Sequence, residues 1–342
     1  MWGGRVASMT PLHRSPRILV VAPNWIGDAL MAQPLLARLR EKLPQVRIDV
    51  LAPSWVAPVV RRMPEVSGVI ETSFAHGGLE LRERWRLGRT LKALRYDQAI
   101  VLPNTWKSAL APFFAGIRTR SGYVGESRYG LLNSRYRKPP GREPMASHYA
   151  RLSAKPGAEV ELPLPNPGLQ VDAQAAERTR ERFGLPARYA VLCPGAEYGP
   201  AKRWPYFQAL AERLALPAVL LGSPKEREQC AAIKGRNLAG ETTLDEAIDL
   251  LTHAQYVVSN DSGLMHVAAA LGRPQVALFG SSSPQHTPPL SDRARVLWLG
   301  IECSPCYARE CPLGHFRCMK ELTVDRVLEK LGSDPIFREN GV

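Results

Sequence analysis

Short apolar runs alternate with helical patterns along the first half of the chain. Runs rich in Val, Ile and Leu predict strands at residues 17–23, 47–53, 69–72 and 98–103. Between these runs, apolar residues recur at helical spacing and predict helices at residues 29–43, 56–62, 79–95 and 105–114. Strands that alternate with helices indicate parallel strands joined by helical crossovers.

The second half repeats this alternation. Its apolar runs predict strands at residues 189–194, 218–222, 256–260 and 274–280, and its helical patterns predict helices at 204–215, 243–254 and 263–271. Between the halves, residues 163–168 (PLPNPG) have the composition of an interdomain linker. We therefore expect an α/β protein with two Rossmann-like, doubly wound parallel-sheet domains that face a cleft. Ligands of such sheets bind beyond the carboxyl ends of the strands.

The length of 342 residues suits two domains of roughly 150 residues each. We place them at residues 17–165 and 166–342, the second with a Cys-rich segment at 303–318 and a C-terminal helix. Residues 1–16 lack the apolar core of a secretory signal, so we interpret them as a disordered leader or as sequence upstream of the true start. No apolar run approaches the ~20 residues that span a bilayer, which predicts a soluble protein.

The net charge of +13 is unevenly distributed. Residues 1–165 contain 25 Lys and Arg against 12 Asp and Glu, whereas residues 166–342 contain 20 of each class. We therefore expect the first half to face nucleic acid, anionic lipid headgroups or a phosphorylated glycan, with a solubilising basic surface as the alternative. None of the recognition motifs of nucleic-acid-binding proteins is present, which argues against nucleic acid.

In the second half, the stretch VVSNDSGLMH (257–266) is a strand that ends in a polar turn and opens a helix. Asp261 and Ser262 suit the N-cap position, and Gly263 lets a ligand approach the backbone closely. The following amides and the helix dipole form an anion site suited to a diphosphate, with His266 one turn further on. A plain capped helix is the alternative interpretation.

Two more loops of the second half follow strands. The loop at 193–205 (CPGAEYGPAKRWP) carries Lys202, whose charge can stabilise a leaving phosphate. The loop at 220–228 (LLGSPKERE) carries Glu226, which can accept hydrogen bonds from ribose hydroxyls. An exposed basic loop and a surface glutamate are the ordinary alternatives. Together, the three strand-end loops favour a nucleotide site more strongly than any one of them does.

In the first half, the stretch PNWIGDALMAQPLL (23–36) opens a helix with Asp28 in its first turn. Asp28 either complements the helix dipole, a role worth about 0.3–1 kcal/mol, or acts as a general base toward an acceptor hydroxyl. We expect the helix N-terminus to hold Asp28 ionised at neutral pH. Gly27 permits close approach of a substrate, and Trp25 offers a face for a sugar ring. Spacing alone leaves the two roles of Asp28 open.

Several stretches resemble those of the ADP-heptose:lipopolysaccharide heptosyltransferase II family, within glycosyltransferase family nine. In order along residues 17–300, they are VAPNWIGDALMAQPLL, RMPEV (62–66), AHGGLELRERWRLG (75–88), VLPNTWKSALAPFFAGI (101–117), GLLN (130–133), CPGAEYGPAKRWP, NLAGET (237–242) and NDSGLMHVAAALGRPQVALFG. The resemblance implies a GT-B fold and inverting transfer of L-glycero-D-manno-heptose from ADP-heptose to the first heptose of the lipopolysaccharide inner core. It makes residues 17–165 the acceptor-binding domain and residues 166–342 the ADP-heptose-binding domain.

The resemblance also implies roles for the residues of the expected cleft. The family's catalytic aspartate falls on Asp28 and its cleft lysine on Lys202. Its nucleotide-binding turn falls on Asp261, Ser262, Gly263 and His266. Glu226 falls where related heptosyltransferases contact the ribose, and Ser262 keeps the hydroxyl of the threonine that relatives often carry.

The basic first domain is then expected to meet a glycolipid acceptor of the heptosyl-Kdo2-lipid A type, as a cytoplasmic enzyme peripheral to the inner-membrane surface. Candidates for the acceptor contacts are Trp25, Gly27, Arg62, Lys107, Arg118, Arg120 and Arg128. No DxD-like pair is well placed in the expected cleft, so we expect catalysis without a metal or other cofactor. A heptosyltransferase I-like or other ADP-sugar transferase and, less favoured, a nucleotide-sugar 2-epimerase are the alternatives.

Four of the six cysteines lie close together near the end of the sequence. Cys303, Cys306, Cys311 and Cys318 have the spacing C-x2-C-x4-C-x6-C, with His315 inside. In a reducing cytosol such a cluster indicates a metal site before it indicates disulfides. We expect a structural zinc, with an iron–sulfur site, disulfides and unliganded thiols as alternatives.

Overall fold

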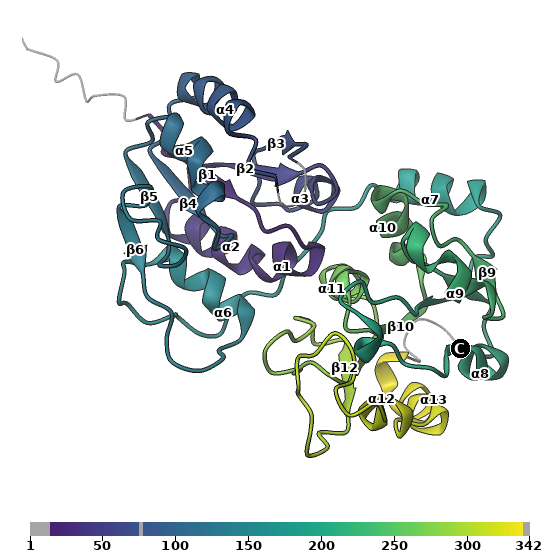
Figure 1. Ribbon diagram of the computed structural model, residues 1–342. Helices are drawn as coiled ribbons and strands as arrows, with labels where there is room; N and C mark the ends of the chain where they lie inside the picture. The colour runs from purple at the N-terminus through teal and green to yellow at the C-terminus, as the bar shows by residue number, and fades with distance from the viewer. Residues whose placement is uncertain (1–13, 75–77, 338–342) are drawn as a thin grey trace, which may run out of the picture.

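The computed structural model describes residues 14–74 and 78–337 of the chain. Two six-stranded parallel sheets with helices packed around them form two bodies that meet at helices α1 and α11 (Figure 1). The first sheet lies within residues 17–136 and the second within 190–298, on opposite sides of the predicted linker. The expected leader falls outside the described residues, except for residues 14–16.

The first sheet has the strand order β3-β2-β1-β4-β5-β6. Its strands are β1 (Arg17–Val21), β2 (Arg47–Pro53), β3 (Gly68–Thr72), β4 (Gln98–Val101), β5 (Thr119–Tyr123) and β6 (Ser134–Tyr136). Its helices are α1 (Ile26–Met31), α2 (Gln33–Lys42), α3 (Ala57–Arg61), α4 (Leu81–Ala93), η1 (Trp106–Ala109), α5 (Leu110–Phe114), α6 (Met145–Ala150) and η2 (Arg151–Ser153). The central strands are buried on both faces, which explains their continuous apolar runs.

The second sheet has the order β12-β11-β10-β7-β8-β9. Its strands are β7 (Ala190–Cys193), β8 (Ala218–Leu220), β9 (Arg236–Asn237), β10 (Tyr256–Asn260), β11 (Gln275–Phe279) and β12 (Ala294–Trp298). Its helices are α7 (Ala173–Arg182), η3 (Pro200–Lys202), α8 (Phe207–Arg213), η4 (Pro224–Glu226), α9 (Arg227–Ala231), α10 (Leu244–His253), α11 (Gly263–Ala270), α12 (Arg317–Lys320), α13 (Val324–Ser333) and η5 (Pro335–Phe337).

The helix predicted at residues 29–43 begins earlier and is divided in two. α1 starts at Ile26, and the helical path breaks at Ala32, which caps the start of α2. Pro34 lies in the first turn of α2, where a proline has no amide to donate to the preceding turn. The break shortens α1 to a six-residue segment that points its first turn at the other domain.

The sequence patterns missed several elements, among them β5, β6, β12 and α6. Strand β5 reads TRSGY, too polar for an apolar run, yet its Ser121 and Gly122 are buried between β4 and β6. The hydroxyl of Ser121 accepts a hydrogen bond from Gln98 Nε2 at 3.0 Å. Sheet pairing and this side-chain hydrogen bond satisfy the polar groups of β5. The sequence pattern predicted no strand there because the segment is polar.

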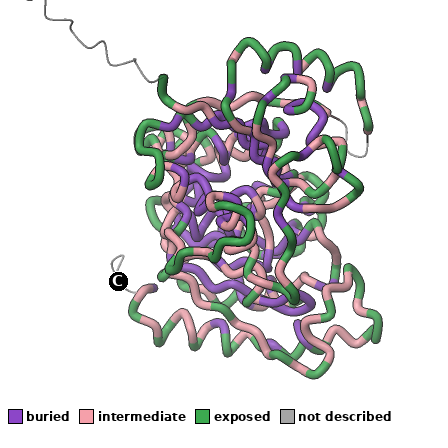
Figure 2. The backbone as a smooth tube through the Cα atoms, turned by 90° about the vertical axis from the view of Figure 1, so that its left-hand side faces the viewer, coloured by how far each residue is buried: buried purple, intermediate pink, exposed green. Residues whose placement is uncertain are grey.

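One hydrophobic cluster continues through both domains. Buried side chains of α1 and α2 share it with those of α10 and α11, and the buried segments run through the interior of the molecule (Figure 2). Helix α1 packs on α11, and α3 packs on α10. The two domains are therefore held together by apolar contact along helices as well as by the chain that links them.

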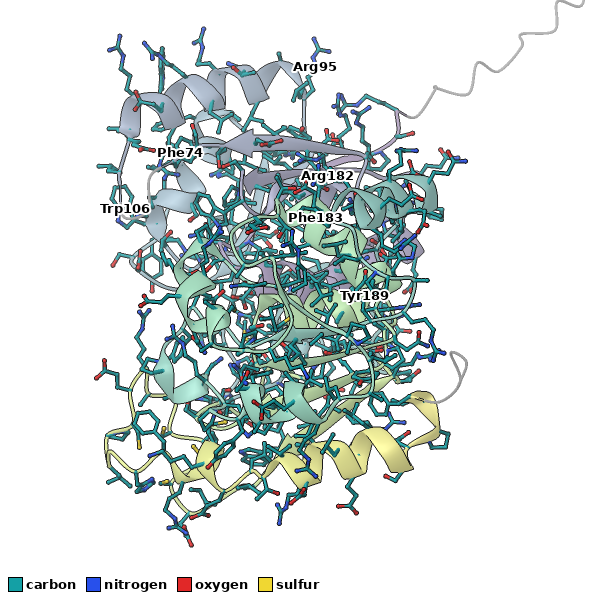
Figure 3. All side chains as sticks on the ribbon, turned by 90° about the vertical axis from the view of Figure 1, so that its right-hand side faces the viewer. Phe74, Arg95, Trp106, Arg182, Phe183 and Tyr189 are labelled. Carbon is teal, nitrogen blue, oxygen red and sulfur yellow. The ribbon has the colours of Figure 1, made fainter. Side chains whose placement is uncertain are left out.

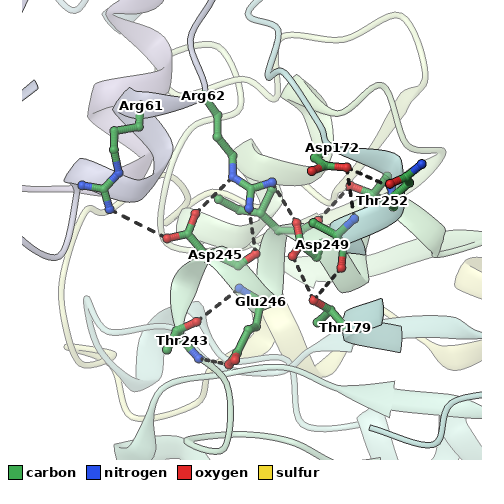
Figure 4. A network of polar contacts seen from close by, with 12 residues as sticks. Arg61, Arg62, Asp172, Thr179, Thr243, Asp245, Glu246, Asp249 and Thr252 are labelled. Carbon is green, nitrogen blue, oxygen red and sulfur yellow. Dashed lines mark hydrogen bonds and ion pairs between the residues drawn. The ribbon is translucent and has the colours of Figure 1, made fainter. Parts of the chain in front are cut away.

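A polar network joins the domains beside this apolar contact (Figure 4). Arg62, which follows α3, donates to Asp249 Oδ1 at 2.9 Å and to Asp245 Oδ1 at 3.1 Å, both on α10. The side chain of Asp249 is only 8% exposed and also accepts from Thr179 Oγ1 at 3.0 Å. The backbone takes part as well, because Gln170 N donates to Arg62 O at 2.7 Å. Arg62 therefore ties the first domain both to the segment that follows the linker and to α10.

We expect Arg62→Ala to lower the free energy of unfolding by about 2–3 kcal/mol, because it removes the cationic partner of a buried carboxylate. Arg61→Ala is the matched control, since both acidic partners of Arg61 are about half exposed. Its loss should stay below about 1 kcal/mol. Urea unfolding of the two variants measures the difference. Equal losses of unfolding free energy would contradict the larger contribution expected from the Arg62 network.

Candidate active site

The first turns of α1 and α11 meet at the junction of the two domains. Each helix follows the carboxyl end of a central strand, β1 in the first sheet and β10 in the second. A Cβ atom on Gly27 would lie 2.7 Å from Cδ2 of His266, and one on Gly263 would lie 3.2 Å from Cβ of Ile26. The missing side chains therefore allow the two helices to approach this closely.

Asp28 lies in the first turn of α1 and faces the second domain. The hydroxyl of Tyr149 on α6 donates to Asp28 Oδ1 at 3.3 Å. Burial raises the pKa of Asp28, while the Tyr149 hydrogen bond and electrostatic interactions with His286 and Lys202 lower it in part. The negative charge of Asp261 raises the pKa further, although it is the smallest of these effects. Asp28 thus lies within electrostatic reach of the groups expected to hold the donor.

The direction of this pKa shift differs from the one expected from the sequence. We expected the helix N-terminus to hold Asp28 ionised. Burial at the domain junction outweighs the short helix, because a carboxylate loses hydration there that the six residues of α1 do not replace. Asp28 is a stronger base than an ordinary aspartate as a result.

Lys202 and Asp261 form an ion pair on the opposite side of the junction. Lys202, at the end of η3, lies 2.6 Å from Asp261 Oδ2, and the Ser282 hydroxyl donates to the same oxygen at 2.5 Å. The Lys202 ammonium also lies 4.9 Å from the ring centroid of Tyr198. The pair holds the ammonium group beside the first turn of α11, where an anionic ligand would meet both.

Ser262 occupies the N-cap position of α11, but its side chain accepts no hydrogen bond from the first turn. The hydroxyl lies 3.3 Å from that of Ser259 instead. His266 follows one turn later and is buried, and burial lowers its pKa to about 4. Its ring is therefore neutral at pH 7 and can both donate and accept a hydrogen bond.

Glu226 lies at the carboxyl ends of β7 and β8. Its Oε2 accepts from Ser223 N at 2.7 Å and from Ser223 Oγ at 3.0 Å, which closes a capping box around η4. The carboxylate passes so close to Gly195 and Gly222 that a Cβ on either would overlap it. The structure thus holds Glu226 rigidly at a strand-end position, and its ribose contact stays a prediction.

The predicted acceptor contacts are spread over the first domain. Trp25 is about half exposed directly before α1, and Lys107 on η1 donates to Gly78 O at 3.5 Å. Arg128 is buried, and its guanidinium donates to the carbonyl oxygens of Pro103 and Tyr123, so it supports the strand-end loops. Their roles toward the acceptor stay predictions.

Arg118 and Arg120 lie apart from the other predicted acceptor residues. Thr119 is level with Gln98 at the start of β4, so both arginines lie at the amino edge of the sheet, opposite the edge that carries Asp28. Arg120 donates to the carbonyl oxygens of Ile117 and Leu131 at 2.6 Å each. Their acceptor contacts stay predictions. Arg62 is engaged by the second domain.

The sequence analysis missed Tyr149 and His286. His286 follows β11 and its Nδ1 lies 2.7 Å from Glu143 O, while Met145 N donates to His286 O at 2.9 Å. The loop after β11 therefore reaches the start of α6 in the first domain. The sequence did offer one signal for His286, its position after a predicted strand. The loops that follow parallel strands all lie at the carboxyl edge of the sheet, where ligands bind. Tyr149 lies on a helix that no pattern predicted.

Two six-stranded parallel domains that meet at their strand-end loops form a GT-B fold, the fold of one class of glycosyltransferases. Residues 84–317 match glycosyltransferase family 9 (heptosyltransferase), and the chain belongs to this family.

Two curated relatives and one solved structure are similar over nearly their whole length. Lipopolysaccharide heptosyltransferase 2 of Escherichia coli (strain K12) is 44% identical over 93% of this chain and 98% of its own. The enzyme of the same name from Salmonella typhimurium is 44% identical over 95% and 100%. The structure of E. coli ADP-heptose lps heptosyltransferase II superposes with a TM-score of 0.84 at 42% identity, over 95% of this chain and 100% of the other.

We expect Asp28→Asn to stabilise the folded protein at neutral pH. Because burial raises the pKa of Asp28, ionising it costs the folded chain more than the unfolded chain. The native protein therefore loses stability as the pH rises through the ordinary aspartate pKa toward the raised one, and the variant does not. Urea unfolding at pH 8 and near pH 4 should show a larger gain at pH 8. A variant less stable than the native chain at pH 8 would contradict the shift.

Proposed function

We propose that the protein transfers L-glycero-D-manno-heptose from ADP-heptose to the first heptose of the lipopolysaccharide inner core, with inversion at the transferred carbon. One observation carries the proposal above the others. The Asp28 carboxylate of the first domain and the Lys202–Asp261 pair of the second approach each other at the start of α11. The similarity to two heptosyltransferases named for lipopolysaccharide supports the choice of donor and acceptor.

In the proposed reaction, Asp28 acts as general base. Its carboxylate accepts the proton of the acceptor hydroxyl, whose oxygen forms a bond to the anomeric carbon of the donor heptose. The bond from that carbon to the diphosphate breaks on the opposite face, and ADP leaves with the electron pair. A base on one face and a leaving group on the other produce inversion.

The second domain stabilises the charge that grows on the departing ADP. The donor diphosphate competes with Asp261 for the ammonium of Lys202, and the first amides of α11 add their dipoles. The neutral ring of His266 supplies a hydrogen bond without adding charge. In this proposal, leaving-group stabilisation comes from these groups and requires no catalytic metal.

Asp28→Asn should reduce heptose transfer by about a hundredfold or more, since the amide cannot accept the proton. The assay incubates ADP-heptose with a core truncated after one heptose and detects the gain of one heptose by mass spectrometry. Calorimetry should show ADP affinity close to that of the native chain. Lys202→Ala, in contrast, should weaken ADP binding as well as transfer.

Three outcomes would contradict the proposal. Full transfer by Asp28→Asn would show that Asp28 is not the general base. Transfer only to a core without heptose would favour an acceptor of the heptosyltransferase I type. Thermal stabilisation by UDP and not by ADP would favour the nucleotide-sugar 2-epimerase alternative.

We infer further that the enzyme works at the cytoplasmic face of the inner membrane, with α4 against the lipid surface. Of the helices in the described ranges, none combines the length and apolar character that crossing a bilayer requires. Helix α4 exposes Leu81 and Trp85, each about half accessible, beside exposed Arg82, Arg86 and Arg89. Mixed apolar and basic side chains suit a surface of anionic headgroups.

The start of α4 lies near the strand-end loops of the first domain. Phe74 and Trp106 lie beneath one end of the helix and Arg95 at the other (Figure 3). The Arg84 guanidinium stacks 4.0 Å above the Phe74 ring and donates to Lys107 O at 3.2 Å. A protein bound to the membrane through α4 would therefore hold a membrane-bound acceptor near the carboxyl edge of the first sheet. Helix α1, which carries Asp28, begins at the same edge.

Replacing Trp85, Arg82 and Arg86 together by alanine should lower binding to phosphatidylglycerol vesicles by about tenfold or more, since each basic side chain near such a surface contributes about 1 kcal/mol. Cosedimentation measures the loss, and phosphatidylcholine vesicles should bind both proteins weakly. The matched control replaces Arg213 and Arg236, exposed arginines of the second domain. Equal losses in both variants would contradict a docking surface on α4.

A further inference from the structure

The segment from the end of β12 through α12 carries four cysteines around one small cavity. Cys303, Cys306, Cys311 and Cys318 line it together with His315, and its volume is about 20 Å³. None of the four is in a disulfide. A cavity of this size accommodates about one water molecule or one ion.

Backbone amides point at the sulfur of Cys311. The amide of Phe316 donates to Cys311 Sγ at 3.4 Å, and His315 Nδ1 lies 4.0 Å from the same sulfur. Amide donors to a sulfur are the outer support that thiolate ligands of metals commonly have.

The other three sulfur-bearing side chains line the same cavity as Cys311. Thiolates that share one cavity repel, and a bound dication relieves the repulsion. Among the described residues no three such side chains converge as tightly as the ligands of a bound ion, so binding would draw the sulfurs inward.

We propose that Cys303, Cys306, Cys311 and Cys318 bind one zinc ion, and that this site holds the loop that carries Lys202. Four cysteines separated by two, four and six residues provide the four thiolates of a closed tetrahedral zinc site.

The stretch between Cys306 and Cys311 packs directly on the loop before Lys202. Ala201 N donates to Arg309 O at 3.0 Å, and the Tyr198 hydroxyl donates to Tyr307 O at 2.6 Å. A Cβ on Gly199 would overlap the carbonyl of Arg309, so the two loops are in close contact. Movement of the cysteine segment therefore moves η3, whose last residue is Lys202.

The same stretch also contacts the other half of the ion pair. Tyr307 N donates to Ser281 O at 2.7 Å, and the neighbouring Ser282 holds Asp261. The Arg142 guanidinium of the first domain stacks 3.8 Å above the Tyr307 ring. A metal that fixes Cys306 and Cys311 thus fixes Lys202, Asp261 and a contact between domains. The consequence for ADP binding rests on the proposed donor site.

The experiment measures metal content and ADP affinity in the same preparations. The full chain, expressed with zinc in the medium, should carry one zinc by plasma mass spectrometry and release it to a colorimetric chelator when a mercurial is added. Cys311→Ser and Cys306→Ser should lose the zinc and bind ADP about tenfold more weakly. Cys306 is exposed, so its substitution tests the site without disturbing the core. Cys230→Ser, a buried thiol outside the cluster, should keep both properties.

Lys202→Ala separates this proposal from the proposed function, because it should lose ADP affinity and keep its zinc. The native chain without stoichiometric metal, or with iron in place of zinc, would overturn the assignment of the metal. Zinc retained in both cysteine variants would overturn the assignment of the ligands. Zinc loss with unchanged ADP affinity would overturn the link to Lys202.

Discussion

The close contact between α1 and α11 is the constraint on which the rest of the structure depends. Two glycines leave room for it, since Gly27 lies against the His266 ring and Gly263 against Ile26. A methyl group at Gly27 would force the helices apart at the position where the two domains contribute their charged groups. The fold can place reactive groups from two separately folded sheets within reach of one another only because these positions carry no side chain.

Closeness of the domains also sets the electrostatics of the site. Burial at the junction raises the pKa of Asp28 and lowers that of His266, so Asp28 is costly to ionise and His266 stays neutral. The positive charge of Lys202, beside the first turn of α11, is neutralised by Asp261. A diphosphate that binds as proposed would meet groups already held in place by the fold, with Asp261 balancing the charge of Lys202 until the ligand arrives.

Three contacts around the junction keep this geometry. Arg62, at the end of α3, forms ion pairs with two aspartates of α10. His286 Nδ1 contacts the backbone oxygen of Glu143, just before α6. The Arg142 guanidinium stacks on the ring of Tyr307 in the cysteine segment. The Arg62 contact lies at the end of α3, whereas the other two are neighbours, since the rings of His286 and Tyr307 are 6.3 Å apart. Each of the three ties one domain to the other. The cysteine segment is distinctive, because it also contacts the loop of Lys202.

The sequence by itself determined the central strands, the helices between them and the strand-end turns that carry Asp28, Lys202 and Asp261. Those features depend on local hydrophobic period and turn chemistry, which a single chain segment contains. Only the tertiary structure decided the polar strand β5, the partner of Arg62, the edge on which Arg120 lies and the direction of the Asp28 pKa shift. Each of these depends on groups that are distant in sequence, since pairing, burial and neighbouring charge arise only when the sheets and the two domains have come together.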